Sequence, residues 1–379
     1  MKLFDVYPLY DVTPVRAKDV YVYDENGTEY LDLYGGHAVI SIGHGHPRYL
    51  ERLTQQMHQI GFYSNAIHNP LQHELANAIG EHSCCHDYQL FLCSSGAEAN
   101  ENALKLASFH TDKARIIAFD HAFHGRTSAA VAATDNPSIN APLNQQQKVT
   151  FLPFNDEKAL ENELKKGDVC AVIFEAIQGV GGLDEPSETF VYAMERLCNE
   201  YSACLIADEV QAGFGRTGTF FAYQKYRIEP HIICMAKGMG NGFPIGGILV
   251  HPSIGAKYGM LGTTFGGNHL ACAASLAVLD VLKEENLQAH AKDLGEYFMQ
   301  KAKEIDGVRI IKGRGLMLGL EFDFEVGPLR KELIYNHHIF TGGSSNKKLL
   351  RILPPLTVQQ KHIDFFFTQL EIALKTIAA

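Results

Sequence analysis

Between residues 90 and 250, short apolar runs alternate with helical patterns, and this alternation limits the folds that the chain can adopt. The runs at 115–119, 169–174 and 203–207 have the length and composition of strands that are buried on both faces. Strands that alternate with helices form a mostly parallel sheet with helices on both sides. The pattern therefore predicts an α/β fold whose main sheet lies in this part of the chain.

The two ends of the chain predict a second, smaller α/β domain. A long helix is expected at 269–284, and strand-like runs then alternate with helical patterns up to a final helix. Near the start, the alternating runs at 20–23 and 30–33 flank a turn that contains Asn26-Gly27, which predicts a β-hairpin. The predicted division is an N-terminal arm and hairpin that belong to the small domain (1–45), a large domain (46–268), and a connecting helix with the C-terminal small domain (269–379).

Residues suited to binding or catalysis follow directly after the apolar runs of the main sheet. Parallel strands end at the same edge of a sheet, and ligands bind outside that edge. Side chains in these positions are therefore expected to share one site. The residues concerned are Ser95, Phe123, Glu175, Asp208 and Lys237.

Lys237 stands in a glycine-rich stretch, 236–247, directly after the apolar run 232–235. An amine with an apolar strand behind it and no adjacent carboxylate is expected to have a lowered pKa. Such an amine can attack a carbonyl group and form a Schiff base. The alternative is a lysine whose ammonium group reaches solvent beside a flexible loop.

Three further residues have binding roles that compete with structural ones. Ser95 precedes a helix whose N-terminus would favour a phosphate, and its hydroxyl also suits an N-cap, so both roles are compatible. Arg126 could hold a carboxylate with two parallel hydrogen bonds. Asp208 ends a buried strand, where its charge needs a partner; a protonated ring nitrogen or Arg216 could supply it.

The composition excludes several classes of partner. The formal net charge is -10 and the pI is near 6.0, without a basic run, so nucleic acid and anionic membranes are poor candidates. The absence of a long apolar stretch and of a signal-peptide pattern predicts a cytoplasmic protein. The 8 cysteines lack a Cys-x-x-Cys pair and are predicted to be reduced and buried. The histidines, among them His44, His46, His82 and His86, lack a convincing metal-ligand spacing.

Five motifs, in order along the chain, resemble those of the class III, ornithine-type aminotransferases of fold type I. The motifs are Ser-Ser-Gly-Ala-Glu-Ala-Asn at 94–100, Phe-His-Gly-Arg-Thr at 123–127, the run from Asp208 to Gly218, Ala-Lys-Gly at 236–238 and Thr-Phe-Gly-Gly-Asn at 264–268. The resemblance extends over essentially the whole chain and is nearest to the acetylornithine aminotransferases of arginine biosynthesis. It implies the pyridoxal-phosphate transferase fold, with a large domain around a mostly parallel sheet and a smaller α/β domain.

The resemblance also implies the cofactor, pyridoxal 5'-phosphate, and a role for each matching residue. Lys237 and Asp208 are the implied catalytic residues: Lys237 forms the Schiff base with the cofactor, and Asp208 pairs with the pyridine nitrogen. The implied cofactor-binding residues are Ser95, Gly96, Ala97, Phe123, Glu175, Asp208, Gln211, Lys237 and, toward the phosphate of the neighbouring subunit, Thr264. The implied substrate-binding residues are Tyr10, Arg126, Thr263 and Arg351. A homodimer with shared active sites is the implied assembly.

One motif departs from the pattern of the resembled family. Its usual Glu-Pro-x-Gln-Gly-Glu appears here as Glu-Ala-Ile-Gln-Gly-Val at 175–180. In ornithine-type enzymes the second acid can pair with the carboxylate-binding arginine, which Val180 cannot do. Arg351 is therefore expected to stay available, which would suit an N-acyl ornithine with an acidic acyl group, such as N-succinylornithine.

The implied reaction is transfer of the terminal amino group of N-acetyl- or N-succinylornithine to 2-oxoglutarate. Its products would be the N-acyl-glutamate semialdehyde and glutamate. Other ω-amino donors remain open: free ornithine, 4-aminobutyrate and diamines. An aminomutase or racemase on the same scaffold is a further alternative. A non-catalytic pyridoxal-phosphate sensor would need a nucleic-acid-binding domain, for which this chain has neither spare length nor basic charge.

Overall fold

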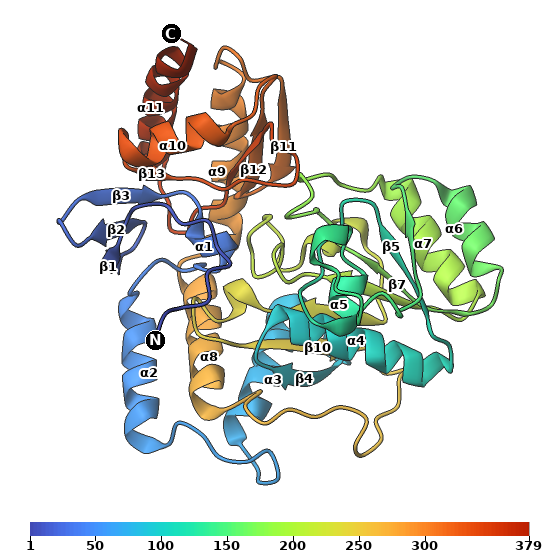
Figure 1. Cartoon of the computed structure of the whole chain (residues 1–379). Coiled ribbons are helices and arrows are strands. Elements are labelled where there is room, and N and C mark those ends of the chain that lie inside the picture. Colours follow the sequence, from blue (N-terminus) through green and yellow to red (C-terminus); the bar gives the residue numbers. More distant parts are fainter. Residues whose placement is uncertain (379) are drawn as a thin grey trace.

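A seven-stranded sheet forms the centre of the computed structural model, which describes residues 1–378 (Figure 1). β10 runs antiparallel to both of its neighbours, and the remaining adjacent pairs are parallel. In spatial order the strands are β4 (Gln89–Cys93), β10 (Gly246–Val250), β9 (Ile232–Met235), β8 (Cys204–Asp208), β7 (Val169–Phe174), β5 (Arg115–Phe119) and β6 (Val149–Leu152). The predicted α/β fold with a mostly parallel sheet is confirmed.

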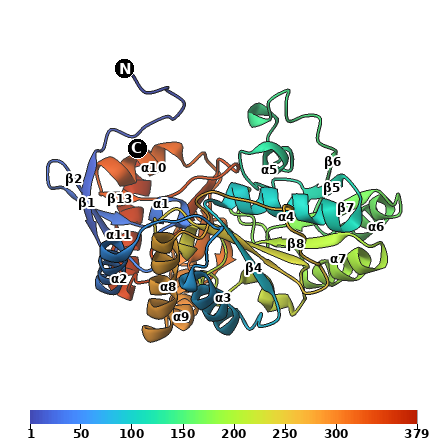
Figure 2. The same ribbon diagram turned by 90° about the horizontal axis from the view of Figure 1, so that it is seen from below.

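Helices cover both faces of this sheet (Figure 2). Residues of α4 (Gly96–Thr111) pack with alternate residues of the central strands, such as Cys204 and Ile206 of β8. The other residues of the same strand, such as Leu205 and Ala207, belong to the core that contains α7 (Glu188–Glu200). Because both faces are covered, β7, β8 and β9 are buried at every position, which explains their continuous apolar sequences.

Two smaller sheets lie beside the main one. A four-stranded sheet has the order β1 (Pro14–Lys18), β2 (Tyr21–Asp24), β3 (Glu29–Asp32) and β13 (Ile339–Phe340). A three-stranded sheet has the order β11 (Ile310–Arg314), β12 (Met317–Glu321) and β14 (Leu349–Ile352). The predicted hairpin is confirmed as β2 and β3, whereas β1 lies in the segment predicted to be an arm. The side chains of β1 are almost all exposed, so its sequence lacks the alternation that marks a strand.

The other helices pack beside or around these sheets. α8 (His269–Glu284) has the bounds predicted from the sequence, and it packs against α2 (Pro47–Gln59) and α3 (Pro70–Ser83). The remaining helices are α1 (Gly35–Ala38), α5 (Ser128–Ala132), α6 (Glu157–Leu164), α9 (Leu287–Ala302), α10 (Gly327–Tyr335) and α11 (Gln360–Ala378). Short 3-10 turns occur at Pro137–Ile139, Ala222–Tyr226 and Lys237–Met239.

The N-terminal sheet lies next to the C-terminal elements, because β13 pairs in parallel with β3 (Figure 1). This pairing brings Leu31 and Asp32 beside Ile339 and Phe340. The domain boundaries at 45/46 and 268/269 stay a prediction, and residue 379 lies outside the described residues.

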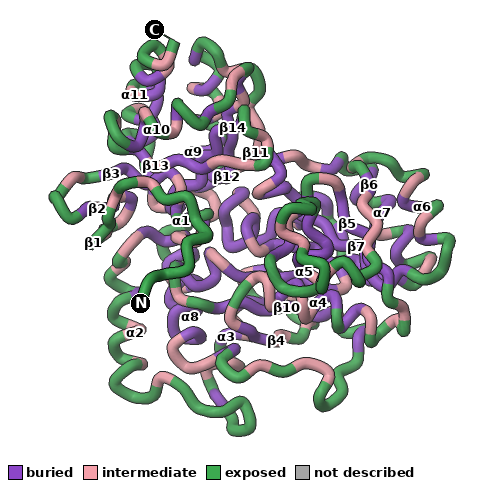
Figure 3. The backbone as a smooth tube through the Cα atoms, in the orientation of Figure 1, coloured by how far each residue is buried: buried purple, intermediate pink, exposed green. Residues whose placement is uncertain are grey.

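The central strands of the main sheet and α8 are mostly buried (purple), whereas β1 and most of α2 are exposed (green) (Figure 3). The first nine residues are also exposed. Within residues 1–378, every helix is too short or too polar to cross a membrane.

Candidate active site

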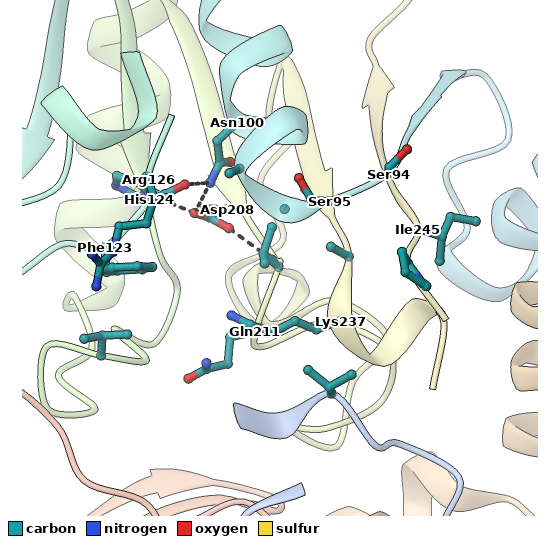
Figure 4. A pocket seen from close by; sticks show the side chains of 18 of the residues that line it. Ser94, Ser95, Asn100, Phe123, His124, Arg126, Asp208, Gln211, Lys237 and Ile245 are labelled. Carbon is teal, nitrogen blue, oxygen red and sulfur yellow. Dashed lines mark hydrogen bonds and ion pairs between the residues drawn. The ribbon is translucent and has the colours of Figure 1, made fainter. Parts of the chain in front are cut away.

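The carboxyl ends of five strands of the main sheet surround a pocket of about 350 Å³. β4, β5, β7, β8 and β9 each end at this edge of the sheet. The sequence-predicted residues that line the pocket are Ser95, Gly96, Ala97, Phe123, Arg126, Glu175, Asp208, Gln211 and Lys237. Figure 4 shows most of these side chains around one common space. The structure therefore brings together the residues that the sequence placed after the strands.

Asp208 is only 4% exposed, and three donors of the same chain form hydrogen bonds with its carboxylate. Its Oδ2 accepts hydrogen bonds from Nδ2 of Asn100 and from Nδ1 of His124, both at 2.7 Å (Figure 4). Its Oδ1 accepts one from the backbone N–H of Val210 at 3.0 Å. These three hydrogen bonds fix the orientation of the carboxylate. A carboxylate oxygen accepts more than one hydrogen bond, so Oδ1 retains capacity for a donor in the pocket.

Asn100 and His124 are functional residues that sequence reasoning missed. Asn100 Nδ2 also donates to the backbone carbonyl of His124, so the two residues are fixed to each other as well as to Asp208. Both side chains are fully buried. Asn100 lies one helical turn into α4, on the side that faces β8. The available signal was that Asn100 and His124 belong to the motifs at 94–100 and 123–127. The competing prediction of an ion pair between Asp208 and Arg216 is wrong, because Arg216 donates to the backbone carbonyls of Leu316 and Pro354.

The N-terminus of α4 opens into the same pocket. Ser95 is its N-cap, and the Ser95 hydroxyl accepts from the N–H of Glu98 at 3.2 Å. The Glu98 carboxylate reaches back to the N–H of Ser94 at 2.8 Å, so the turn is a capping box shifted by one residue. Within residues 1–378 the N–H groups of Gly96 and Ala97 have no partner. This arrangement suits an anion such as a phosphate.

Close packing explains the glycine at the start of α4. A Cβ atom on Gly96 would lie 2.5 Å from Cγ1 of Val210, which follows β8. A larger residue would push the helix N-terminus away from the end of β8, and with it the two free N–H groups away from Asp208.

Glu175, at the end of β7, has a raised pKa. Its carboxylate accepts from the backbone N–H of Phe123 at 3.0 Å and of Gly179 at 2.8 Å. Burial raises the pKa of Glu175 to about 7 despite these two donors. Glu175 thus fixes the loop that carries Phe123, whose half-buried ring borders the pocket.

Lys237 lies at the centre of the site. Its backbone has a φ of 47°, in the left-handed region that a non-glycine residue seldom adopts, and such strain concentrates at functional sites. Burial lowers the pKa of Lys237, and the Arg351 charge lowers it further, against the opposing effect of Asp208 and Glu175. The predicted low-pKa lysine therefore has a structural basis, whereas the alternative of a lysine reaching solvent does not fit its buried surroundings.

Arg351 approaches the site from β14 and is only 3% exposed. Its guanidinium donates to Oε1 of Gln211 at 3.1 Å and to the backbone carbonyls of Gly179 and Gly343. Burial lowers the pKa of Arg351 to about 10. Val180, which lines the pocket, offers this arginine no charge.

Four predicted residues are not among those that line the pocket of this chain: Tyr10, Thr263, Thr264 and Arg351. Thr264 is exposed, and Thr263 Oγ1 accepts from the backbone N–H of Gly266. Tyr10 packs against the edge of Tyr335, with ring centroids 6.3 Å apart. Arg126 lines the pocket but is exposed. The predicted roles of these residues toward substrate or a second subunit stay predictions.

The histidines that sequence analysis left unassigned form structural contacts. His44 Nε2 lies 2.9 Å from Asp32 Oδ2, and His46 Nε2 lies 2.8 Å from Glu285 Oε1. No group of three or more possible metal ligands occurs within residues 1–378. All eight cysteines are free. The prediction that they are buried is wrong for Cys84, which is exposed at the end of α3, and for Cys85, which is half-buried.

The donors and acceptors of the pocket fit pyridoxal phosphate. The free N–H groups of α4 match a phosphate, and Asp208 matches a protonated ring nitrogen. The Phe123 ring matches a planar heterocycle, and the amine of Lys237 matches an aldehyde. One pocket thus supplies a complementary group for each chemical feature of this cofactor.

Comparison with known proteins finds aminotransferases that match this chain over nearly its whole length. The family profile described as aminotransferase class-III matches residues 6–374. The acetylornithine aminotransferase of Aquifex aeolicus is 40% identical over 375 residues, which are 96% of this chain and 96% of that protein. That of Bacillus subtilis is 39% identical, over 98% of this chain and 97% of that protein. The crystal structure of the ornithine aminotransferase from Toxoplasma gondii superposes with a TM-score of 0.91 and 28% identity, over 98% of this chain and 92% of that one.

Proposed function

Because this chain belongs to the class-III aminotransferases, which use pyridoxal phosphate, we propose that it transfers the terminal amino group of an N-acylated L-ornithine to 2-oxoglutarate. The products are the N-acyl-glutamate semialdehyde and glutamate, as in arginine biosynthesis. The acyl group is acetyl or succinyl. The proposal is supported by relatives of 34–40% identity that are named acetylornithine aminotransferases.

The structural observation that carries the proposal is Arg351, a buried guanidinium without a carboxylate partner within residues 1–378. A buried arginine of this kind attracts an anionic substrate, because a carboxylate of the ligand compensates its charge. Both half-reactions bring such a carboxylate, from the acyl-ornithine and from 2-oxoglutarate. Arg126, which lines the pocket and is exposed, supplies a second cation.

Each residue of the pocket has a separate task in this proposal. Pyridoxal phosphate, when bound, supplies an aldehyde and an electron-withdrawing ring. The N–H groups of Gly96 and Ala97 hold the phosphate, and Phe123 covers the ring. Asp208 keeps a proton on the ring nitrogen, because three donors hold its carboxylate in place.

Lys237 moves the proton in the chemical step. Its lowered pKa gives Nζ a larger uncharged fraction near neutral pH than a surface lysine has. Nζ would then take the proton from the substrate carbon that carries the amino group and hold it for delivery to the cofactor. The strand β9 behind the lysine is buried at every position, so water has no access from that side of the site.

We further propose a cytoplasmic homodimer whose two sites lie at the subunit interface. An exposed apolar surface covers α2 and the loops that follow α2 and precede α8, and large apolar patches mark association sites. Phe62 and Phe265 touch in this surface, with ring centroids 5.4 Å apart, and Thr264 lies next to Phe265. Its exposed apolar residues are Leu50, Met57, Ile60, Phe62, Tyr63, Ile67 and Phe265.

The amino donor is tested by the absorption spectrum of the purified holoenzyme. Each donor is added alone, and the yellow absorbance of bound pyridoxal phosphate should fall with N-acetyl- or N-succinylornithine and return with 2-oxoglutarate. Loss of absorbance with free ornithine, 4-aminobutyrate or a diamine, but with neither acylated compound, would contradict the proposed donor. Isomer formation without 2-oxoglutarate would point instead to an aminomutase or racemase.

A further inference from the structure

Two arginines flank Gly343 near β13 and β14, and neither is among the residues that line the active-site pocket. Arg330 and Gly343 line a smaller hollow of about 200 Å³. Arg351 donates from Nε to the backbone carbonyl of Gly343. Arg330, from α10, lies so close that a Cβ on Gly343 would be 2.7 Å from its Nη1. A glycine at this position therefore lets both guanidinium groups approach the same short stretch of backbone.

Neither arginine has a carboxylate within 4.0 Å among residues 1–378. Arg330 makes a single side-chain hydrogen bond in this part of the chain, from Nη2 to the carbonyl of Thr341 at 3.1 Å, and its Nε is buried without a partner. The Thr341 hydroxyl beside it is also buried and without a partner. Like charges held together without an acid repel each other, and a carboxylate ligand removes that repulsion.

The two arginines lie at different depths. Arg351 is near enough to Lys237 to lower the pKa of its amine, whereas the Arg330 charge lowers the pKa values of Arg351 and His37. Arg330 is half-buried, and its guanidinium carbon lies 5.7 Å from the centroid of the Tyr10 ring of the N-terminal arm. Arg330 is thus placed for the distal end of a substrate whose reacting amine lies at Lys237.

We propose that Arg330 and Arg351 together bind the carboxylate at the end of an acidic N-acyl group, so that the enzyme selects an N-acyl ornithine of the succinyl type over the acetyl type. This inference rests on the proposed function and narrows its substrate class. Arg351 alone serves 2-oxoglutarate, which is shorter, whereas the longer acyl chain reaches both guanidinium groups. Arg330 is therefore the specificity-determining residue.

The test compares Arg330→Met with wild type in kcat/KM for the two acyl-ornithines and for 2-oxoglutarate. We expect a loss of about 10-fold or more for N-succinylornithine, mostly through a higher KM, and less than about 3-fold for N-acetylornithine and 2-oxoglutarate. Arg330→Lys keeps the charge and should restore part of the loss. Arg309→Met is the matched control, because Arg309 lies in the same C-terminal region, is exposed and pairs with Asp323. Equal losses for all three substrates, or none, would overturn the inference.

A binding measurement separates this inference from the proposed function. N-succinylnorvaline and N-acetylnorvaline carry the two acyl groups but lack the reacting amine, and they are tested as inhibitors of the half-reaction with glutamate, followed by the absorbance of the holoenzyme. N-succinylnorvaline should bind wild type about 10-fold more tightly than Arg330→Met, while N-acetylnorvaline binds both equally. If glutamate reacts but no acyl-ornithine does, the proposed donor is wrong while this result still decides the role of Arg330. Equal binding of N-succinylnorvaline to both proteins would refute that role.

Discussion

The two sides of the pocket handle charge in opposite ways. On one side the buried acid, Asp208, accepts hydrogen bonds from three donors of the chain. On the other side Arg330 and Arg351 have no acidic partner within residues 1–378. The cofactor wall is defined as Ser95, Asn100, His124, Asp208 and Lys237, which line the pocket. The substrate wall is defined as Val180, which lines it, together with the nearby Tyr34, Arg330 and Arg351. A group that stays bound requires a preorganised partner, and a ligand that comes and goes brings its own countercharge. The difference indicates which wall serves chemistry and which serves selection.

Removal of Lys237, the amine of the cofactor wall, should have the largest effect on turnover. Lys237→Ala should lower turnover by at least about 10³-fold, because no other side chain of the wall can attack an aldehyde or move the substrate proton. Equilibrium dialysis should show that pyridoxal phosphate still binds, since the phosphate and ring contacts remain. Lys225→Ala, at a surface lysine paired with Glu185, is the control and should leave turnover unchanged. Substantial turnover by Lys237→Ala would contradict the assignment of the central lysine.

Loss of one donor to Asp208 should have a smaller effect. Asn100→Ala removes the hydrogen bonds to Asp208 and to the carbonyl of His124, and a bond to a charged group is worth about 1.5–3 kcal/mol. We expect affinity for pyridoxal phosphate to fall roughly 10- to 100-fold, measured by titration of the apo-protein. Asn102→Ala in the same helix, where Nδ2 donates only to the carbonyl of Glu98, should change little. Equal effects of both variants would mean that Asn100 only stabilises α4.

An acid placed on the substrate wall should give Arg351 a charged partner within the chain. In Val180→Glu, a substrate carboxylate must displace that partner. We expect kcat/KM to fall about 10-fold for N-succinylornithine and less for N-acetylornithine. Val180→Thr has a similar shape without a charge and should leave the ratio of the two values unchanged. A uniform loss for both donors would count against an open Arg351.

The smallest expected effect concerns Glu209, the neighbour of Asp208 that is buried away from the pocket. Its carboxylate accepts only the N–H groups of Ala222 and Tyr223, and burial raises its pKa to about 7 from an ordinary value of 4.5. Between these values the folded protein retains a proton that the unfolded chain releases. Its contribution to stability is therefore complete below pH 4.5 and is lost as the pH rises through 7.

Differential scanning fluorimetry at pH 5 and pH 8 can measure this loss. Relative to Glu209→Gln, the melting temperature of the wild type should be lower at pH 8 than at pH 5 by roughly 2–5 °C. The exposed Glu296→Gln serves as the control. If the difference between wild type and Glu209→Gln is the same at both pH values, the carboxyl of Glu209 does not titrate in this range.

The cofactor wall was largely predictable from the sequence, because each of its principal residues directly follows an apolar run. Asp208 and Lys237 stand at or just after the end of a strand, and the apolar runs in the sequence identify these strands. Asn100 was harder to identify, since its contact with Asp208 spans 108 positions and arises only when α4 packs on the sheet.

The substrate wall could be predicted only in part. Arg351 was identified through a resemblance, but Arg330 gave no signal, because a helical arginine usually lies on a solvated face. Its proximity to Arg351 depends on the approach of α10 to Gly343, a tertiary contact. Similarly, β1 was missed since an exposed edge strand carries no apolar alternation.

The parallel pairing of β3 with β13 also has a consequence for biogenesis. It joins Leu31 to Ile339, so the first sheet cannot be completed until about three hundred further residues have been synthesised. At 5–20 residues per second this takes roughly 15–60 s, during which the edge of β3 remains open. Open strand edges recruit other chains, so this interval is when the nascent polypeptide is most exposed to aggregation and has most need of a chaperone.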